Sequence, residues 1–129
     1  MSKLAAITGG AGFIGSHLAE GFLKNGYAVR VIDNLTAASI ANLAEVGREV
    51  DYRKVDIRDL DGLTEALTDV SVVLHHAGIS SVPRFEDLDY THDVNVTGTF
   101  NVFTAASCAG VRRNSEYRLR NADFGRSRQ

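Results

Sequence analysis

Residues 7–18, ITGGAGFIGSHL, carry the pattern that decides the fold of this chain. A short apolar run at residues 4–7 leads into a glycine-rich turn, after which Phe13, Ile14 and Leu18 follow at helical spacing. The pattern predicts a strand, a tight turn and then a helix. The N-terminus of such a helix has unsatisfied N–H groups and a partial positive charge, so the turn predicts a site for phosphate groups.

The glycines of this turn fit two spacings, Gly10-x-Gly12-x-x-Gly15 and Gly9-x-x-Gly12-x-x-Gly15. Either spacing alone is weak evidence, because glycines also cluster in ordinary turns. In both, the missing side chains allow a tight turn, a close approach of a pyrophosphate to backbone amides, and packing of the helix on the strand. The turn therefore predicts the binding of a dinucleotide.

An acidic residue ends the next predicted strand. Asp33 follows Val29-Arg30-Val31-Ile32, which is expected to form the strand, and lies 18 residues beyond Gly15. A spacing of about 20 is typical of the carboxylate that accepts both hydroxyls of an adenosine ribose. The alternative is that Asp33 caps the following helix. Since a carboxylate repels a 2′-phosphate, the spacing favours NAD over NADP as the cofactor.

The composition is typical of one globular domain. Of the 129 residues, 44% are hydrophobic and 23% are charged, which is enough to form a core. No apolar run reaches the length of a membrane span, and the first residues do not resemble a signal peptide. Cys108 is the single cysteine, which excludes an internal disulfide and indicates the reducing cytoplasm. We expect no membrane partner.

Apolar periodicity predicts alternating strands and helices through residue 111. Strands are expected at residues 3–8, 28–33, 50–55 and 72–75, and helices at 13–25, 40–46, 59–70 and 87–109. This alternation predicts an α/β fold, a partial Rossmann fold with a parallel sheet of order 3-2-1-4, flanking helices and the fifth strand onward missing. The third strand is expected at the edge, and the ligand at the carboxyl ends of the first and fourth strands.

Several side chains in the second half of the chain have a structural interpretation. Val94, Phe100 and Phe103 are expected in the core and not at a substrate site. His75 and His76 end a buried strand, and no Asp, Glu or Cys stands near them at the spacing of metal ligands. We therefore expect a packing role for both histidines and predict no metal site.

The last 18 residues differ in composition from the rest. Residues 1–111 carry eight Lys and Arg against fourteen Asp and Glu, whereas residues 112–129 carry six Arg against two acids. The segment 112–129 has no apolar run and no period, so we expect an Arg-rich, disordered tail after a domain at 1–111. Without a fifth strand, residues 72–75 would form an exposed apolar edge.

Five motifs in order resemble the extended short-chain dehydrogenase/reductase family, specifically its NAD-dependent sugar-nucleotide epimerases and dehydratases. The motifs lie within residues 3–113 and read TGGAGFIGS at 8–16, DNL at 33–35, DIRD at 56–59, HHAG at 75–78 and NVTGT at 95–99. Five motifs in register are far more specific than one glycine turn.

The resemblance implies NAD as the cofactor and assigns roles to twelve residues. They are Gly9, Gly12, Phe13, Ile14 and Gly15 at the pyrophosphate, Asp33 and Asn34 at the adenosine ribose, Asp56 and Ile57 at the adenine, Ala77 and Gly78 under the nicotinamide ribose, and Asn95 at the loop after the fourth strand. Where the epimerases have a lysine that contacts the cofactor, this chain has Ser80.

The chemistry of this family requires a Tyr-x-x-x-Lys pair, in which the lysine lowers the pKa of the tyrosine that removes a hydroxyl proton. Lysines stand only at positions 3, 24 and 54, and Asn121 follows Tyr117 at the required distance. We therefore expect no catalytic residue, and a truncated or frame-shifted chain after Arg113. The expected function is the NAD-binding portion of an enzyme that moves a hydride between a UDP-sugar and NAD, inactive by itself.

Two other functions fit parts of the sequence. A non-catalytic NAD-binding sensor or regulatory module would keep the cofactor motifs and lack the catalytic pair. Nucleic-acid binding through the Arg-rich tail is disfavoured, because no aromatic platform accompanies the arginines and the rest of the chain is acidic. We expect NAD as the partner, a UDP-sugar only in an intact homologue, no nucleic acid, and no firm homodimer.

Overall fold

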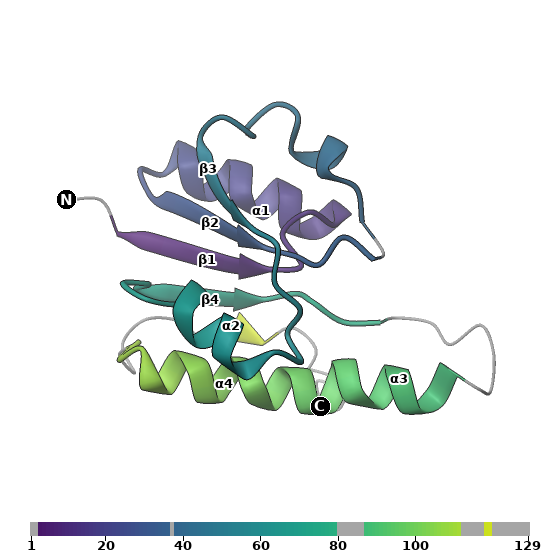
Figure 1. Cartoon of the computed structure of the whole chain (residues 1–129). Helices are drawn as coiled ribbons and strands as arrows, with labels where there is room; N and C mark the ends of the chain where they lie inside the picture. Colours follow the sequence, from purple (N-terminus) through teal and green to yellow (C-terminus); the bar gives the residue numbers. More distant parts are fainter. Residues whose placement is uncertain (1–2, 37, 80–86, 112–117, 120–129) are drawn as a thin grey trace, which may run out of the picture.

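A parallel sheet of five strands forms the centre of the computed structural model of the chain (Figure 1). The structure describes residues 3–36, 38–79, 87–111 and 118–119. The strands are β1 (Leu4–Thr8), β2 (Ala28–Ile32), β3 (Val50–Arg53), β4 (Val72–His75) and β5 (Arg118–Leu119). Their order in the sheet is β3-β2-β1-β4-β5, which confirms the predicted order of the first four strands and the edge position of β3.

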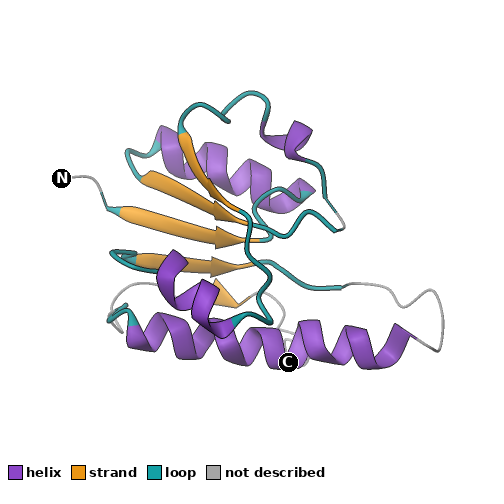
Figure 2. Cartoon of the chain, viewed as in Figure 1, coloured by secondary structure: helices purple, strands orange, loops and turns teal. Residues whose placement is uncertain are grey.

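Helices cover both faces of the sheet (Figure 2). They are α1 (Phe13–Lys24), the 3-10 helix η1 (Ile40–Leu43), α2 (Leu60–Ala66), α3 (Leu88–His92), the π-helix η3 (Asp93–Gly98) and α4 (Thr99–Cys108). The last three follow one another without a break, so the long helix predicted at 87–109 is confirmed, with a π-helical segment inside it. The helix predicted at 40–46 is shorter and of the 3-10 type.

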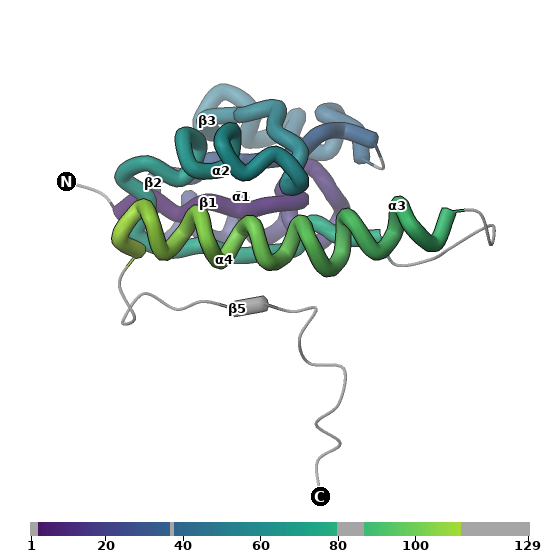
Figure 3. Tube along the Cα trace, turned by 60° about the horizontal axis from the view of Figure 1, so that its bottom comes forward, coloured from purple at the N-terminus to yellow at the C-terminus, as the bar shows by residue number. Residues whose placement is uncertain are grey.

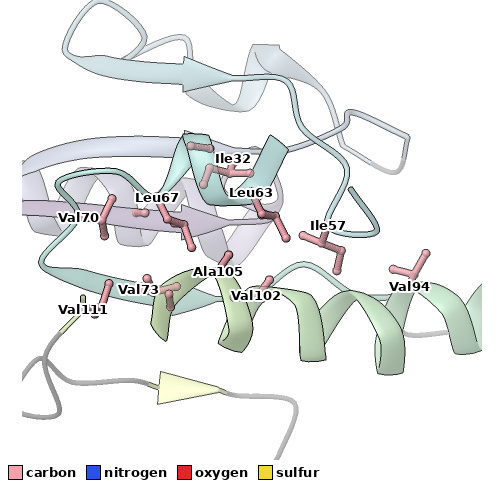
Figure 4. Packing of buried hydrophobic residues seen from close by; sticks show 13 residues of the cluster. Ile32, Ile57, Leu63, Leu67, Val70, Val73, Val94, Val102, Ala105 and Val111 are labelled. Atoms are coloured by element: carbon pink, nitrogen blue, oxygen red, sulfur yellow. The ribbon is translucent and has the colours of Figure 1, made fainter. Parts of the chain in front are cut away.

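The alternation of side chains along each strand produces two cores. Ala5 and Ile7 of β1 face α1, whereas Ala6 faces α2 and α4. The core on the α1 side includes Ala19, Val29, Val31, Leu43, Val72 and Leu74. The core on the α2 and α4 side includes Ile32, Leu63, Leu67, Val73, Val102 and Ala105 (Figure 4). The sheet is thus buried on both faces, as the apolar runs of a parallel sheet require.

Small side chains bring α4 close to α2 and the sheet. Val102, Ala105 and Ala106 have at most 1% of their surface exposed, and α4 lies beside α2 on the same face of the sheet (Figure 3). Phe100 and Phe103, which were predicted in the core, are instead 71% and 39% exposed. That prediction was wrong because the helix is apolar on more than one side, and the sheet covers the side with the small residues. Val94 is buried, as predicted.

A fifth strand is present, contrary to the prediction. β5 pairs in parallel with β4 through the residue pairs Leu74–Arg118 and His75–Leu119. All four residues of β4 are buried, so the predicted exposed apolar edge is also wrong. A strand of two residues has no apolar run, and periodicity cannot reveal it. The rest of the tail whose disorder was predicted, 112–117 and 120–129, lies outside the described residues.

Within the described residues, no helix is long and apolar enough to cross a membrane.

The α2 core offers a test of the packing. Leu63 of α2 is fully buried, and Leu63→Ala should lower the free energy of unfolding by about 2–5 kcal/mol because it leaves a cavity. Leu60, on the same helix, is 38% exposed, and Leu60→Ala should cost about 1 kcal/mol or less. Urea denaturation of both variants measures the difference. Equal losses would contradict the packing described for α2.

Candidate dinucleotide-binding cleft

An open cleft of about 820 Å³ lies at the carboxyl ends of the central strands. β1 has β2 on one side and β4 on the other, so the chain connections leave this point in opposite directions, as they do where open α/β sheets bind ligands. All twelve residues that were assigned to the cofactor line this cleft. They come from the turn after β1 (Gly9, Gly12, Phe13, Ile14, Gly15), the end of β2 (Asp33, Asn34), the segment after β3 (Asp56, Ile57), the segment after β4 (Ala77, Gly78) and η3 (Asn95).

Further residues line the cleft that the sequence reasoning did not assign to it. They are Ile32, Thr36, Ala38, Val55, His76, Ile79, Tyr90, Val94 and Val96. Most of them lie next to a motif residue in the sequence, and this position could have predicted that they line the cleft. Tyr90 is different, since it comes from α3 and no pattern in the sequence marks it.

The turn after β1 shows which glycine spacing faces the cleft. Gly9, Gly12 and Gly15 line the cleft, whereas Gly10 does not. A Cβ atom on Gly10 would lie 2.7 Å from Cγ1 of Val31, so Gly10 packs against β2. Gly9 has a φ of +66°, a conformation that residues with a side chain rarely adopt. The structure therefore favours the spacing Gly9-x-x-Gly12-x-x-Gly15 for the ligand side.

The N-terminus of α1 is open to an anion. Gly12 is its N-cap residue, no side chain caps the helix, and no acidic residue stands in the first turn. Two side chains hold the preceding residue, Ala11, in place. The Ala11 N–H donates to Oδ2 of Asp33 at 3.1 Å, and its carbonyl accepts from Nδ2 of Asn42 at 2.8 Å. This N-terminus combines free N–H groups with a positive helix dipole, which suits a pyrophosphate.

Asp33 joins two loops at the cleft. While Oδ2 accepts from Ala11, Oδ1 accepts from the N–H of Leu35 at 2.8 Å. Leu35 has a φ of +62°, so this hydrogen bond supports a strained backbone at the rim. A carboxylate has about four acceptor positions, and these two bonds leave acceptor capacity for ribose hydroxyls.

Asp56 is bound to a neighbouring arginine. Its Oδ2 lies 2.7 Å from Nη2 of Arg58 and accepts from Nδ2 of Asn34 at 3.2 Å. The hydrogen bond from the Arg58 side chain is the main cause that lowers the pKa of Asp56 to about 2. The Arg58 guanidinium also lies 4.9 Å from the ring centre of Tyr90, a cation–π contact. These contacts keep the Asp56 carboxylate ionised at this end of the cleft, with the positive charge of Arg58 beside it.

Asn95 holds the segment that leaves β4. Its Oδ1 accepts from the N–H of Ile79 at 2.7 Å, and its Nδ2 donates to the Ile79 carbonyl at 2.8 Å. One side chain thus satisfies both backbone groups of a residue outside any strand or helix. Ser80, the next residue, lies outside the described residues.

His75 is buried below the cleft and bonded on both ring nitrogens. Its Nδ1 lies 2.6 Å from Oγ1 of Thr8, and its Nε2 lies 2.9 Å from Oγ1 of Thr99. Burial is the main cause that lowers the pKa of His75 to about 4, with a smaller contribution from His76. His75 is therefore neutral at physiological pH and has the structural role that was predicted. Within the described residues, no three His, Cys, Asp or Glu side chains are placed to hold a metal ion.

The order of the sheet, the open helix N-terminus and the acid after β2 define a dinucleotide-binding domain of the Rossmann type. The family model of the 3-beta hydroxysteroid dehydrogenase/isomerase family matches residues 6–114. The chain belongs to this family, and the predicted resemblance to NAD-dependent nucleotide-sugar epimerases and dehydratases is confirmed by its relatives.

Two relatives are UDP-glucose 4-epimerases by name. The one from Klebsiella pneumoniae is 36% identical over 114 residues, which cover 82% of this chain and 81% of that protein. A putative UDP-glucose 4-epimerase of Methanocaldococcus jannaschii is 40% identical over 99 residues, which cover 74% of this chain and 31% of that protein.

Solved structures give the same result. The UDP-glucose 4-epimerase of Thermus thermophilus in complex with NAD has a TM-score of 0.76 and 37% identity, over 84% of this chain and 35% of that one. A dTDP-glucose 4,6-dehydratase of Streptomyces venezuelae with NAD bound also has a TM-score of 0.76, with 36% identity over 84% of this chain and 37% of that one. The chain spans about a third of the length of most of these relatives. The residues that the family model matches, 6–114, include all those that line the cleft.

The buried His75 predicts a loss of stability in weak acid. In the unfolded chain its pKa is near 6.5, and in the folded chain it is about 4, so the unfolded state binds more protons between these values. The contribution of His75 is complete above pH 6.5 and is lost as the pH falls toward 4, by about 3 kcal/mol at most.

Urea denaturation at several pH values measures this loss. His75→Gln removes the titrating ring, so its stability should change less between pH 6.5 and 4 than that of the wild type. The matched control is His92→Gln, at an exposed position of α3, which should keep the wild-type profile. If His75→Gln kept the wild-type dependence of stability on pH, the loss of stability in weak acid would not come from His75.

Proposed function

We propose that the cleft binds NAD, and that this chain is the NAD-binding portion of an enzyme acting on a nucleotide sugar. The observation that carries the proposal is that all twelve residues implied by the resemblance, from five separate segments, line one cleft at the carboxyl ends of β1, β2 and β4. The two solved structures described above contain NAD, and each covers 84% of this chain.

Each end of the cleft suits one part of the cofactor. The N-terminus of α1 takes the pyrophosphate, and Asp33 accepts from the adenosine ribose with Asn34 beside it. Asp56 accepts from the exocyclic amine of adenine, whose face the Ile57 side chain covers. Ala77 and Gly78 lie under the nicotinamide ribose, in the segment that Asn95 fixes through Ile79.

Bound NAD supplies a ring that takes a hydride from a sugar carbon and returns it. The residues of this chain bind and orient that cofactor, and the proton of the sugar hydroxyl needs a Tyr-x-x-x-Lys pair that the sequence does not contain. Among the residues that the structure describes, no lysine lines the cleft. We therefore propose that these 129 residues alone do not epimerise a UDP-sugar, and we keep a cytoplasmic location as a prediction from the single cysteine.

A second candidate is a non-catalytic NAD-binding sensor or regulatory module. The observation in its favour is that the cofactor residues come together while the catalytic pair is missing from the sequence. The two candidates differ in their dependence on a further polypeptide. A partner protein that binds this chain only in the presence of NAD would favour the module.

Thermal unfolding with added nucleotide tests the proposal. NAD at 100 times its dissociation constant should stabilise the chain by about 2.7 kcal/mol, and NADP should stabilise it less because Asp33 repels a 2′-phosphate. In Asp33→Asn the preference for NAD over NADP should fall by about tenfold, because the negative charge is lost. Equal shifts with NAD and NADP in the wild type would contradict the role of Asp33, and no shift with either would overturn the proposal.

Two glycines of α1 form a matched pair for the pyrophosphate site. A Cβ atom on Gly15 would lie 2.7 Å from Cα of Gly10, so Gly15→Ala must displace the turn and should weaken NAD binding by about tenfold or more. A Cβ atom on Gly21 meets nothing within 4 Å, so Gly21→Ala should keep the wild-type affinity. Calorimetric titration with NAD measures both. Equal affinities in the two variants would place the pyrophosphate elsewhere.

A further inference from the structure

The buried hydroxyl of Thr8 connects three segments of the chain. Thr8 is fully buried at the end of β1, and its Oγ1 accepts from the N–H of Ala77 at 3.3 Å. The same oxygen accepts from the N–H of His76 at 3.1 Å, an N–H that also donates to the Thr8 carbonyl at 3.0 Å. His75 Nδ1 is the third group at this hydroxyl, at 2.6 Å. The segment after β4 is thus bonded to the end of β1 through one side chain.

These contacts favour one arrangement of the protons. A hydroxyl has two lone pairs and one proton, and both lone pairs of Thr8 accept backbone N–H groups. Its own proton must therefore be donated to Nδ1 of His75, which makes Nδ1 an acceptor. Since the ring is neutral, the ring proton is on Nε2 and is donated to Oγ1 of Thr99 at 2.9 Å. In this series of hydrogen bonds, Thr8 donates to His75 and His75 donates to Thr99.

The Ala77 backbone lies where it affects the cleft. A Cβ atom on Gly9 would lie 2.6 Å from the Ala77 nitrogen, so the turn after β1 and the segment after β4 pack backbone against backbone. Ala77 and Gly9 both line the cleft. A displacement of Ala77 must therefore change the shape of the cleft at this point.

We propose that Thr99, His75 and Thr8 form a positioning chain that fixes the Ala77 backbone for the nicotinamide half of the cofactor. The proposal rests on the proposed function for its ligand. Thr99, at the start of α4, keeps the ring proton on Nε2, and Nδ1 is then free to accept from Thr8. If Thr99 offered no acceptor, the neutral ring would move its proton to Nδ1 and donate to Thr8 Oγ1, where it would compete with the Ala77 N–H. None of these three side chains lines the cleft, so each acts through the backbone of the segment after β4, at His76 and Ala77.

The first experiment uses the free protein and three variants of α4. Thr99→Val removes the hydroxyl at nearly constant volume, and Thr99→Ser keeps it. Thr104→Val is the control, because the Thr104 hydroxyl donates to the Phe100 carbonyl of its own helix. In the wild type, ¹⁵N chemical shifts should show the His75 proton on Nε2. In Thr99→Val the proton should move to Nδ1, and the Ala77 amide should exchange with solvent about tenfold faster, with Thr99→Ser and Thr104→Val unchanged.

The second experiment measures affinity for NAD and for ADP, which has only the adenine half. Thr99→Val should weaken NAD binding by about five- to tenfold and leave ADP binding unchanged, whereas a merely structural role would lower stability without this difference. Equal weakening of both ligands, or unchanged NAD binding, would overturn the proposal. A wild-type chain that binds neither nucleotide would overturn the proposed function instead, and the proton position and amide exchange would still decide the role of the chain Thr99, His75 and Thr8.

Discussion

The close approach of two backbones, at Gly9 after β1 and at Ala77 after β4, is the constraint on which the cleft depends. Two reasons require glycine at position 9. Its φ is positive, and a Cβ atom there would collide with the backbone of Ala77. β1 and β4 pair in parallel with Thr8 opposite His75, so the segments that follow these two strands leave the sheet at the same level. The segment after β1 turns into α1 on one face of the sheet, and the segment after β4 continues toward α3 and α4 (Figure 1). The cleft is the space between them.

The polar side chains around the cleft hold backbone before any ligand arrives. Asp33 bonds the N–H groups of Ala11 and Leu35, Asn95 bonds both backbone groups of Ile79, and Thr8 bonds the segment after β4. Ordering a loop on binding costs free energy, and loops that are already fixed reduce that cost. Asp33, which the sequence predicts as a ligand contact, thus also gives the cleft its shape, together with Asn95 and Thr8.

The sequence predicts the strands and most of the cleft because those features are local. Strand period, glycine spacing and the acid 18 residues beyond Gly15 are each visible in one stretch of chain. The ion pair of Arg58 with Asp56 is local too, but its contact with Tyr90 joins two distant segments and leaves no pattern. β5 escapes prediction for a related reason, since its two residues are held by pairing with β4 and not by their own composition.

The π-helical segment η3 affects which side of the long helix is buried. Val94, Gly98, Val102 and Ala106 are buried, a repeat of four residues, which is wider than the 3.6 of an α-helix. A π-helical segment supplies wider turns, so the buried side continues past Gly98 where an ideal α-helix would rotate away from it. Gly98 lies against Ile57 so closely that a Cβ atom would be 2.5 Å from its Cδ1. With Asn95 bonded to Ile79 on the same segment, η3 connects the segment after β3, at Ile57, to the segment after β4.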